Sequence, residues 1–148
     1  MPSLIIGADH AGFLLKEAIK PFLSELNYET NDLGPHNEES VDYPDFAQQV
    51  SRRVADGEYS RGILICGTGI GMSMVANRYP EIRAALCNDL FSAIMCRRHN
   101  DANILVMGGR VIGIELAKEI VRAWITTPFE GGRHSDRLDK FCNCRNPE

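Results

Sequence analysis

The chain has 148 residues, 44% of them hydrophobic, and its 16 basic and 20 acidic side chains give a formal net charge of −4. This mildly acidic balance, without a basic run, argues against a nucleic-acid surface and favours small molecules as partners. A single domain over residues 1–148 buries roughly two-thirds of its unfolded surface, so it needs neither a metal nor a disulfide for stability. No segment has the apolar length of a membrane span.

The N-terminus and the cysteines predict a cytoplasmic protein. Residues 1–3 lack the charged region of a signal peptide, and the chain enters a strand at once. Five cysteines at irregular spacings do not form a disulfide framework and suit a reducing compartment. Cys142 and Cys144 form a C-x-C pair without the second ligand pair usual in zinc sites, so we assign it no role.

Residues 4–7 predict a short apolar strand that ends at Asp9 and His10. Ligands of open α/β sheets bind at the carboxyl ends of strands, which makes these two residues candidates for a site. A role of Asp9 in capping the next helix is equally consistent. Pro21 should kink or interrupt that helix. Its predicted apolar face contains Leu14, Leu15, Ala18, Ile19, Phe22, Leu23 and Leu26.

A second strand and helix are predicted next. Residues 28–33 predict a weaker strand, residues 34–41 a polar loop, and Pro44 the first turn of a helix that closes at Gly57. The residues this helix is expected to bury are Phe46, Ala47, Val50 and Val54.

The central stretch is a strand at residues 63–65 that runs into Cys66 and a glycine loop, before a helical pattern resumes over residues 72–78. A strand, a glycine loop and a helix N-terminus together favour an anion site. A thiol at this junction is favoured as a thiolate, which makes it a usable base or nucleophile. The loop glycines are Gly67, Gly69 and Gly71.

Two other interpretations of this stretch stay open. A lone cysteine at a strand end is more often a small core residue than a catalyst. The loop also comes close to the dinucleotide fingerprint G-x-G-x-x-G, although Met72 stands at the last glycine position. Asp89 lies about twenty residues further on, where a ribose-binding acid is expected, so a dinucleotide-binding oxidoreductase is the alternative.

The remaining chain continues the alternation of strands and helices. Residues 83–87 and 103–107 predict strands, and residues 90–98 and 112–124 predict helices. Five strands that alternate with five helices predict an α/β protein with a doubly wound parallel sheet between helical layers. The last of these helices is expected to bury Ile112, Leu116, Ile120 and Trp124.

Two polar clusters lie outside these elements. Residues 98–101 include His99 on a loop, where a functional histidine and a solvated helix end are the two interpretations. Arg133 and Arg137 are four residues apart, so they lie on one helix face and can hold a phosphate between two guanidinium groups. A solvated charged helix is the alternative for this second cluster.

Five stretches of the chain carry a family resemblance: GADHAG at 7–12, DYP at 42–44, GILICGTGIG at 62–71, RHNDAN at 98–103 and GGRH at 131–134. They resemble the type B ribose-5-phosphate isomerases and the related galactose- and allose-6-phosphate isomerases. The resemblance implies a Rossmann-like three-layer α/β/α sandwich with a five-stranded parallel sheet in the order 2-1-3-5-4. It also implies a reaction without metal or other cofactor, and a homodimer, alone or within a tetramer, with active sites built from both subunits.

The resemblance also implies the roles of residues in proton transfer. Cys66 is the base that carries a proton between C2 and C1 of the sugar, and the amides of residues 67–71, with Thr68, stabilise the enediolate oxygen. His99 opens the sugar ring, a task suited to a side-chain type with an ordinary pKa of about 6.5. Asn100 helps to hold the enediolate.

Substrate binding is assigned in the same way. Asp9 binds sugar hydroxyls, and the segment 128–148 contributes to the dimer and to the phosphate site. The phosphate ligands are His10, Arg110, Arg133 and Arg137.

The implied activity is the interconversion of ribose 5-phosphate and ribulose 5-phosphate in the pentose phosphate pathway. A six-carbon substrate, allose 6-phosphate or galactose 6-phosphate, stays open because the distance from the phosphate ligands to the glycine loop sets the substrate length. A non-catalytic sugar-phosphate sensor is a third class, against which the presence of both Cys66 and His99 argues.

Overall fold

The computed structural model describes residues 1–144, apart from the side chains of Cys142 and Asn143. One half of the C-x-C pair, and the end of the segment 128–148, therefore lie outside the described residues. Within residues 1–144, no helix combines the length and the apolar character that a membrane crossing requires.

A single parallel sheet organises the chain, and its strand order is β2-β1-β3-β5-β4, which confirms the predicted order. The two central strands β3 and β5 are buried along their whole length, as expected for a parallel sheet covered on both faces. The strands are β1 (Ser3–Ala8), β2 (Glu29–Asp32), β3 (Gly62–Cys66), β4 (Ala84–Leu86) and β5 (Ile104–Gly108).

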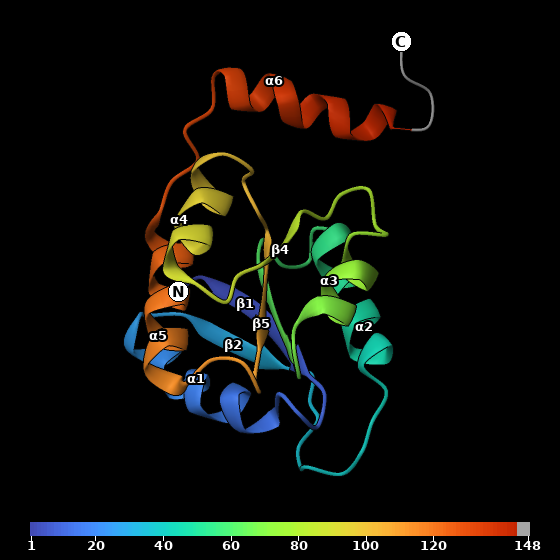
Figure 1. The fold of residues 1–148 in the computed structure, drawn as a ribbon, viewed down its shortest axis with the longest axis vertical. Coiled ribbons are helices and arrows are strands. Elements are labelled where there is room, and N and C mark those ends of the chain that lie inside the picture. The colour runs from blue at the N-terminus through green and yellow to red at the C-terminus, as the bar shows by residue number, and fades with distance from the viewer. Residues whose placement is uncertain (145–148) are drawn as a thin grey trace.

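Helices cover both faces of this sheet, so the predicted three-layer sandwich is confirmed (Figure 1). One face carries α1 (Phe13–Glu25), α4 (Leu90–Arg98) and α5 (Ile114–Thr126), which share a core with the sheet. The other face carries α2 (Tyr43–Ala55) and α3 (Ile70–Ala76), which form a second core. The chain therefore changes faces between the helices that follow β1 and β3.

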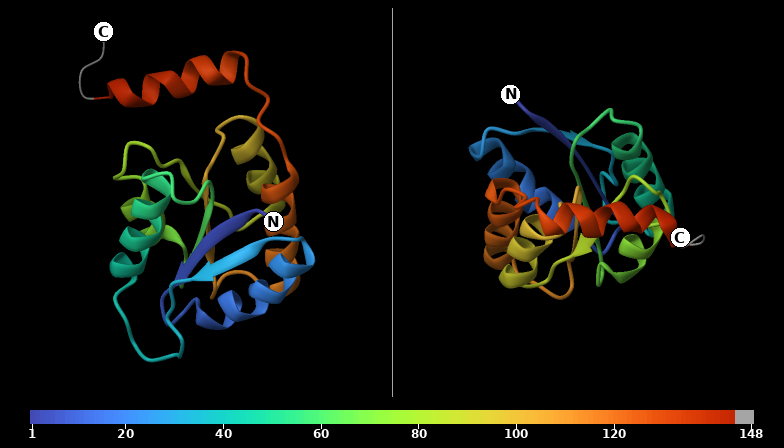
Figure 2. Two further views of the ribbon diagram at one scale, coloured as in Figure 1. Left: turned by 180° about the vertical axis from the view of Figure 1, so that it is seen from behind. Right: turned by 90° about the horizontal axis from the view of Figure 1, so that it is seen from above.

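A C-terminal helix, α6 (Arg133–Asp139), follows the five predicted helices and continues into a short 3-10 turn, η1 (Lys140–Asn143). Seen from above, α6 crosses the end of the sandwich from the side of α4 and α5 towards the side of α2 and α3 (Figure 2). This C-terminal segment thus lies over one edge of the sheet.

Two details of the sequence prediction were wrong. Leu14 and Leu116 were expected in the core but are 65% and 39% exposed. At about 100° per residue, Leu116 lies roughly a quarter turn from the middle of the stripe that α5 buries. Leu14 lies roughly 140° from the middle of the stripe that α1 buries, and therefore close to its solvent side. Pro21 does not break α1, which continues to Glu25, and a kink at Pro21 stays a prediction. Element ends otherwise differ from the prediction by a residue or two.

A buried lysine on α1 was not anticipated. Lys16 has no exposed surface, and its Nζ lies 2.7 Å from Asp32 Oδ2 and 2.9 Å from Glu17 Oε1. Burial opposes ionisation of Asp32, but hydrogen bonds from Lys16, Lys20 and the Gly34 amide outweigh it and lower the pKa of Asp32. This network ties α1 to the end of β2.

Candidate active site

Three loops meet at the carboxyl edge of the sheet, after β1, β3 and β5. The Asp9 amide donates to Ile65 O at 3.1 Å, and the Gly109 amide donates to Cys66 O at 2.8 Å. The loops lie beside the point where the chain changes faces, between β1 and β3, which is the usual ligand position in open α/β sheets.

Glycines allow these loops to pack backbone against backbone. A Cβ atom on Gly12 would collide with the Ile65 carbonyl, and one on Gly108 would lie 2.7 Å from Thr68 O. Both contacts are with backbone, so neither can be relieved by moving a side chain. The absence of side chains at these positions therefore sets how closely the three loops approach each other.

Cys66 lies at the end of β3 and is 4% exposed. Its Sγ accepts a hydrogen bond of 3.2 Å from the amide of Gly69. Gly69 has a φ of +84° and comes directly before α3, which begins at Ile70, two residues earlier than predicted. The amide of Gly69 is thus a specific hydrogen-bond donor to the sulfur, while the thiolate stays a prediction.

The neighbouring loop residues serve different purposes. The Thr68 hydroxyl is exposed and accepts from the Ile70 amide at 3.2 Å. Gly71 lies under the ring of Tyr43, where a Cβ atom would come within 2.6 Å of the ring carbons. Gly67 has ordinary space around it, near the side chain of Arg110. Gly69 is therefore closed to larger residues by its left-handed backbone and by the Met107 backbone, whereas Gly71 is limited by the Tyr43 ring, a side chain that can move.

Asp9 stabilises the turn before α1 but is not its N-cap, which is Gly12, and its role in binding stays a prediction. Its Oδ1 accepts from the Gly12 amide at 3.0 Å, which closes the turn before α1, and the residue is 6% exposed. This bond occupies one of the two carboxylate oxygens. Asp9 therefore holds the loop in place while it lies beside Cys66 at the same edge.

His10 and Arg110 lie on either side of the glycine loop, and their side chains have polar atoms free to bind a ligand. The His10 Nδ1 accepts from the Val41 amide at 3.2 Å, so in the neutral ring the proton lies on Nε2, which can donate to an anion. The Arg110 amide donates to Gly67 O at 3.0 Å, and its side chain is exposed.

Asn88, which the sequence analysis missed, joins two of the loops. Its Oδ1 accepts from the Gly108 amide at 2.9 Å, and its Nδ2 donates to Thr68 O at 3.3 Å. The side chain satisfies polar backbone groups that the loop geometry leaves unpaired. A polar residue directly after the predicted strand 83–87 was the available signal.

The other predicted site residues lie at the opposite edge of the sheet. His99 and Asn100 come just before β5, whose last residue, Gly108, pairs with Cys66. Five strand residues at about 3.3 Å each separate the two ends by roughly 16 Å. Arg133 and Arg137 lie on α6 at this same far edge (Figure 1). One chain therefore does not bring all the predicted residues together.

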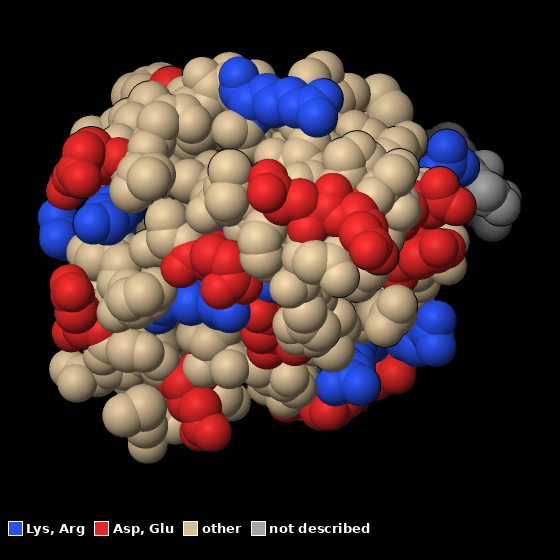
Figure 3. All heavy atoms as spheres, turned by 90° about the horizontal axis from the view of Figure 1, so that it is seen from below, with Lys and Arg blue, Asp and Glu red and all other residues tan. Residues whose placement is uncertain are grey.

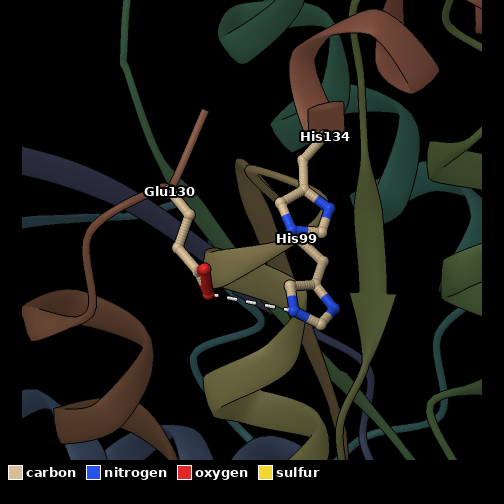
Figure 4. Close-up of side chains that lie close together, drawn as sticks. All are labelled: His99, Glu130 and His134. Atoms are coloured by element: carbon tan, nitrogen blue, oxygen red, sulfur yellow. Dashed lines mark ion pairs between the residues drawn. The ribbon is translucent and has the colours of Figure 1, made fainter. Parts of the chain in front are cut away.

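His99 stacks on His134, the second residue of α6. The ring centroids are 4.3 Å apart and the planes are inclined by 14°. Figure 4 shows the two rings with the carboxylate of Glu130 beside them, its Oε1 3.8 Å from His99 Nε2. His134 was part of a quoted motif but had no predicted role, because nothing local in the sequence pairs residues 35 positions apart.

These three side chains do not have the geometry of a metal site. Their ligand atoms lie within 4.8 Å of one another. The lone pairs of stacked rings lie in nearly parallel planes, however, and do not converge on one point as zinc ligands must. A stacked histidine pair is the better description.

Loss of solvent around the ring, and the charge of the neighbouring His99, lower the pKa of His134. Arg133 and Arg137 act in the same direction, and Glu130 opposes them. His134 is therefore neutral over more of the acid range than an ordinary histidine.

The carboxyl edge does not present a continuous cationic patch. On the face seen in Figure 3, small groups of basic side chains are separated from one another by acidic and uncharged ones. A sugar phosphate carries up to two negative charges, so isolated cations here would hold it weakly.

An open parallel sheet with a buried thiol, a carboxylate and a histidine at the ends of β3 and β1 defines an α/β enzyme that acts on a small molecule. A family model described as Ribose/Galactose Isomerase matches residues 4–141. The chain belongs to this family.

Known members are similar along most of the chain. Ribose-5-phosphate isomerase B of Escherichia coli is 48% identical over 139 residues, which cover 94% of this chain and 93% of that protein. The structure of a ribose 5-phosphate isomerase from Thermotoga maritima matches with a TM-score of 0.92 and 51% identity, covering 95% and 97% of the two chains. A Mycoplasma genitalium ribose-5-phosphate isomerase B with bound ribulose-5-phosphate matches with a TM-score of 0.92, 36% identity and 99% and 97% coverage.

Replacement of Gly69 tests how tightly the loop is packed. Gly69→Ala adds a Cβ atom in a left-handed conformation and against Leu86, so we expect it to lower the free energy of unfolding by about 3 kcal/mol. Gly57→Ala is the matched control, since Gly57 has a φ of +80° but nothing within 4 Å of the added atom. It should cost only about 1 kcal/mol. Urea unfolding followed by circular dichroism measures both, and equal losses would contradict the packing argument.

Proposed function

We propose that this protein interconverts ribose 5-phosphate and ribulose 5-phosphate through an enediolate, as a step of the pentose phosphate pathway. The observation that carries the proposal is the buried Cys66 thiol with an amide donor, placed beside Asp9 in a chain of the ribose/galactose isomerase family. Family membership favours this activity over a dinucleotide-binding oxidoreductase. The free thiols of Cys66, Cys87 and Cys96 support a place in the cytoplasm.

Cys66 is the proposed base of the isomerisation. Its thiolate removes the proton from C2 of the open-chain aldose, and the electron pair moves to O1 to give the enediolate. The thiol then returns the proton to C1, while the O2 proton passes to O1 and C2 becomes the ketone. Amides of residues 67–71, with Thr68, stabilise the oxygen on which charge develops.

Ring opening precedes this step when the substrate is ribose 5-phosphate. The bond between C1 and the ring oxygen O4 breaks, O4 takes a proton, and the O1 hydroxyl loses one to become the aldehyde. We assign the proton transfer to O4 to His99. Asn100 then holds the enediolate.

Binding is assigned to the residues around these two groups. The carboxylate of Asp9 accepts from sugar hydroxyls, and Gly67, Gly69 and Gly71 let the sugar approach the backbone. The phosphate takes two kinds of donor from the two edges of the sheet: His10 and Arg110, and Arg133 and Arg137.

The separation of the two edges supports a homodimer. If the edge with Cys66 of one subunit meets the edge with His99 and α6 of its partner, all the assigned residues gather at one place. The isolated cations of the carboxyl edge then gain two arginines (Figure 3). A dimer with two such sites has twofold symmetry, and it can also form half of a tetramer.

A comparison of substrates tests the activity. We expect higher kcat/KM with ribose 5-phosphate than with allose 6-phosphate or galactose 6-phosphate at equal enzyme concentration, measured as ketose formed. A preference for a six-carbon substrate would assign the chain to the other activity of its family. Tight binding of ribose 5-phosphate without any turnover would support a sensor instead.

Replacement of Cys66 tests the assigned base. Cys66→Ala should reduce isomerisation about a thousandfold, the usual contribution of a general base, while binding of ribose 5-phosphate measured by calorimetry persists. Exchange of the C2 hydrogen with solvent at the wild-type rate in this variant would show that the base lies elsewhere.

Cys87→Ala is the matched control, because Cys87 follows the end of β4 much as Cys66 ends β3. A hydrogen bond with Cys96 and burial raise the pKa of Cys87, so this thiol stays protonated and cannot act as the base. The rate of this variant should stay within about threefold of wild type.

Mixing of inactive variants tests the shared site. Cys66→Ala and His99→Ala subunits, allowed to exchange, form mixed dimers in which one of the two sites has both residues. Random pairing makes half of the dimers mixed, so about a quarter of wild-type activity should return. No recovery despite exchange shown by mass spectrometry would place the whole site within one subunit.

A further inference from the structure

We infer that His134 is a positioning residue for ring opening: its ring, stacked on His99, holds His99 in the orientation that delivers a proton to the ring oxygen. The inference rests on the proposed function of His99. The proposed isomerase activity does not itself require His134. An experiment can therefore disprove the role of His134 without disproving that activity.

The geometry places His134 where only a side chain from another element can orient His99. His99 caps the C-terminal end of α4, and its side chain is 43% exposed, so α4 alone leaves its ring free to rotate. His134 is buried on a helix whose other residues are exposed or half-buried. The stack covers one face of the His99 ring and leaves its nitrogen atoms at the edge (Figure 4).

Backbone hydrogen bonds also hold the segments that carry the two rings close to each other. The Glu130 amide donates to Arg98 O at 3.1 Å, next to His99, and the His134 amide donates to Gly131 O at 3.1 Å. These bonds fix the start of α6 against the end of α4. The position of His134 is thus set by the same segment that would carry Arg133 and Arg137 to the phosphate.

The charges around His134 favour its neutral form, which suits its place as the stacking partner of His99. Its ring faces His99 of α4, Glu130 of the linker, and Arg133 and Arg137 of α6, and the cations among them disfavour a proton on it. A neutral imidazole stacks on His99 whether or not His99 carries a proton, whereas two protonated rings repel. His99 can then gain and lose a proton without breaking the stack.

The chemistry of the two sugars distinguishes a role of His134 in ring opening from a general loss of structure in a variant. Ribose 5-phosphate closes a five-membered ring through O4 and must be opened. Ribulose 5-phosphate has its phosphate on O5, the oxygen that a ketose would need for such a ring, and it is therefore open-chain. Removal of its C1 proton by Cys66 requires no ring opening, so it should require neither His99 nor His134.

The test compares His134→Leu, which removes the aromatic ring, with His134→Phe, which keeps a flat ring without nitrogen atoms. Ser135→Ala, on the next residue of α6, is the control for local disturbance. Two rates are measured for each variant and for wild type: kcat with ribose 5-phosphate, and deuterium incorporation at C1 of ribulose 5-phosphate in heavy water.

His134→Leu should lower kcat with ribose 5-phosphate about tenfold, the scale of one aromatic stack, and leave C1 exchange within about twofold. His134→Phe should retain most of the ribose 5-phosphate activity, and Ser135→Ala should match wild type in both assays. Equal losses of His134→Leu in the two assays would show a structural role and overturn the inference, as would wild-type rates in both. A wild-type protein without ribose 5-phosphate turnover would instead overturn the proposed function.

Discussion

The close approach of three backbone loops at the carboxyl edge is the constraint on which the candidate site depends. Gly12, Gly108 and Gly109 each lie where a Cβ atom would press against backbone atoms of a neighbouring loop. Because the loops touch directly, the end of β3 delivers Cys66 next to Asp9 and beneath the amide of Gly69. Asn88 then satisfies backbone groups of two loops at once. A small displacement of any loop would alter the surroundings of the thiol.

Periodicity in the sequence was sufficient for the sandwich and its strand-helix alternation, because burial on one or both faces leaves a regular apolar pattern. It failed for Leu116 at the margin of a stripe, where burial depends on how far the neighbouring layer extends. It also failed for Leu14, which lies well outside the stripe that α1 buries. The burial of Lys16 could not be predicted from periodicity either, because it depends on a contact and not on a pattern. Its burial depends on Asp32, which lies on another element, and no local pattern pairs the two.

The candidate site was predictable only where strand ends and glycines mark it. Cys66, Asp9 and His10 follow predicted strands, so the topology of an open sheet brings them to one edge. The stack of His99 on His134 joins a helix end to a segment 35 residues later, and its geometry depends on the path of the linker between them. A resemblance supplied the predicted function of His99, but the packing of its ring could be seen only in the structure.

The histidine pair and the thiol occupy opposite edges of one sheet, with the length of β5 between them. Within one chain, a substitution at one edge therefore makes no direct contact with the residues at the other. A sugar phosphate too short to cyclise would not need the proposed ring-opening pair of His99 and His134, but it would still need the proposed phosphate-binding arginines of α6. The fold in this way allows a family to change its substrates through His99 and His134, while the arginines of α6 and the proposed proton-transfer loop stay in place.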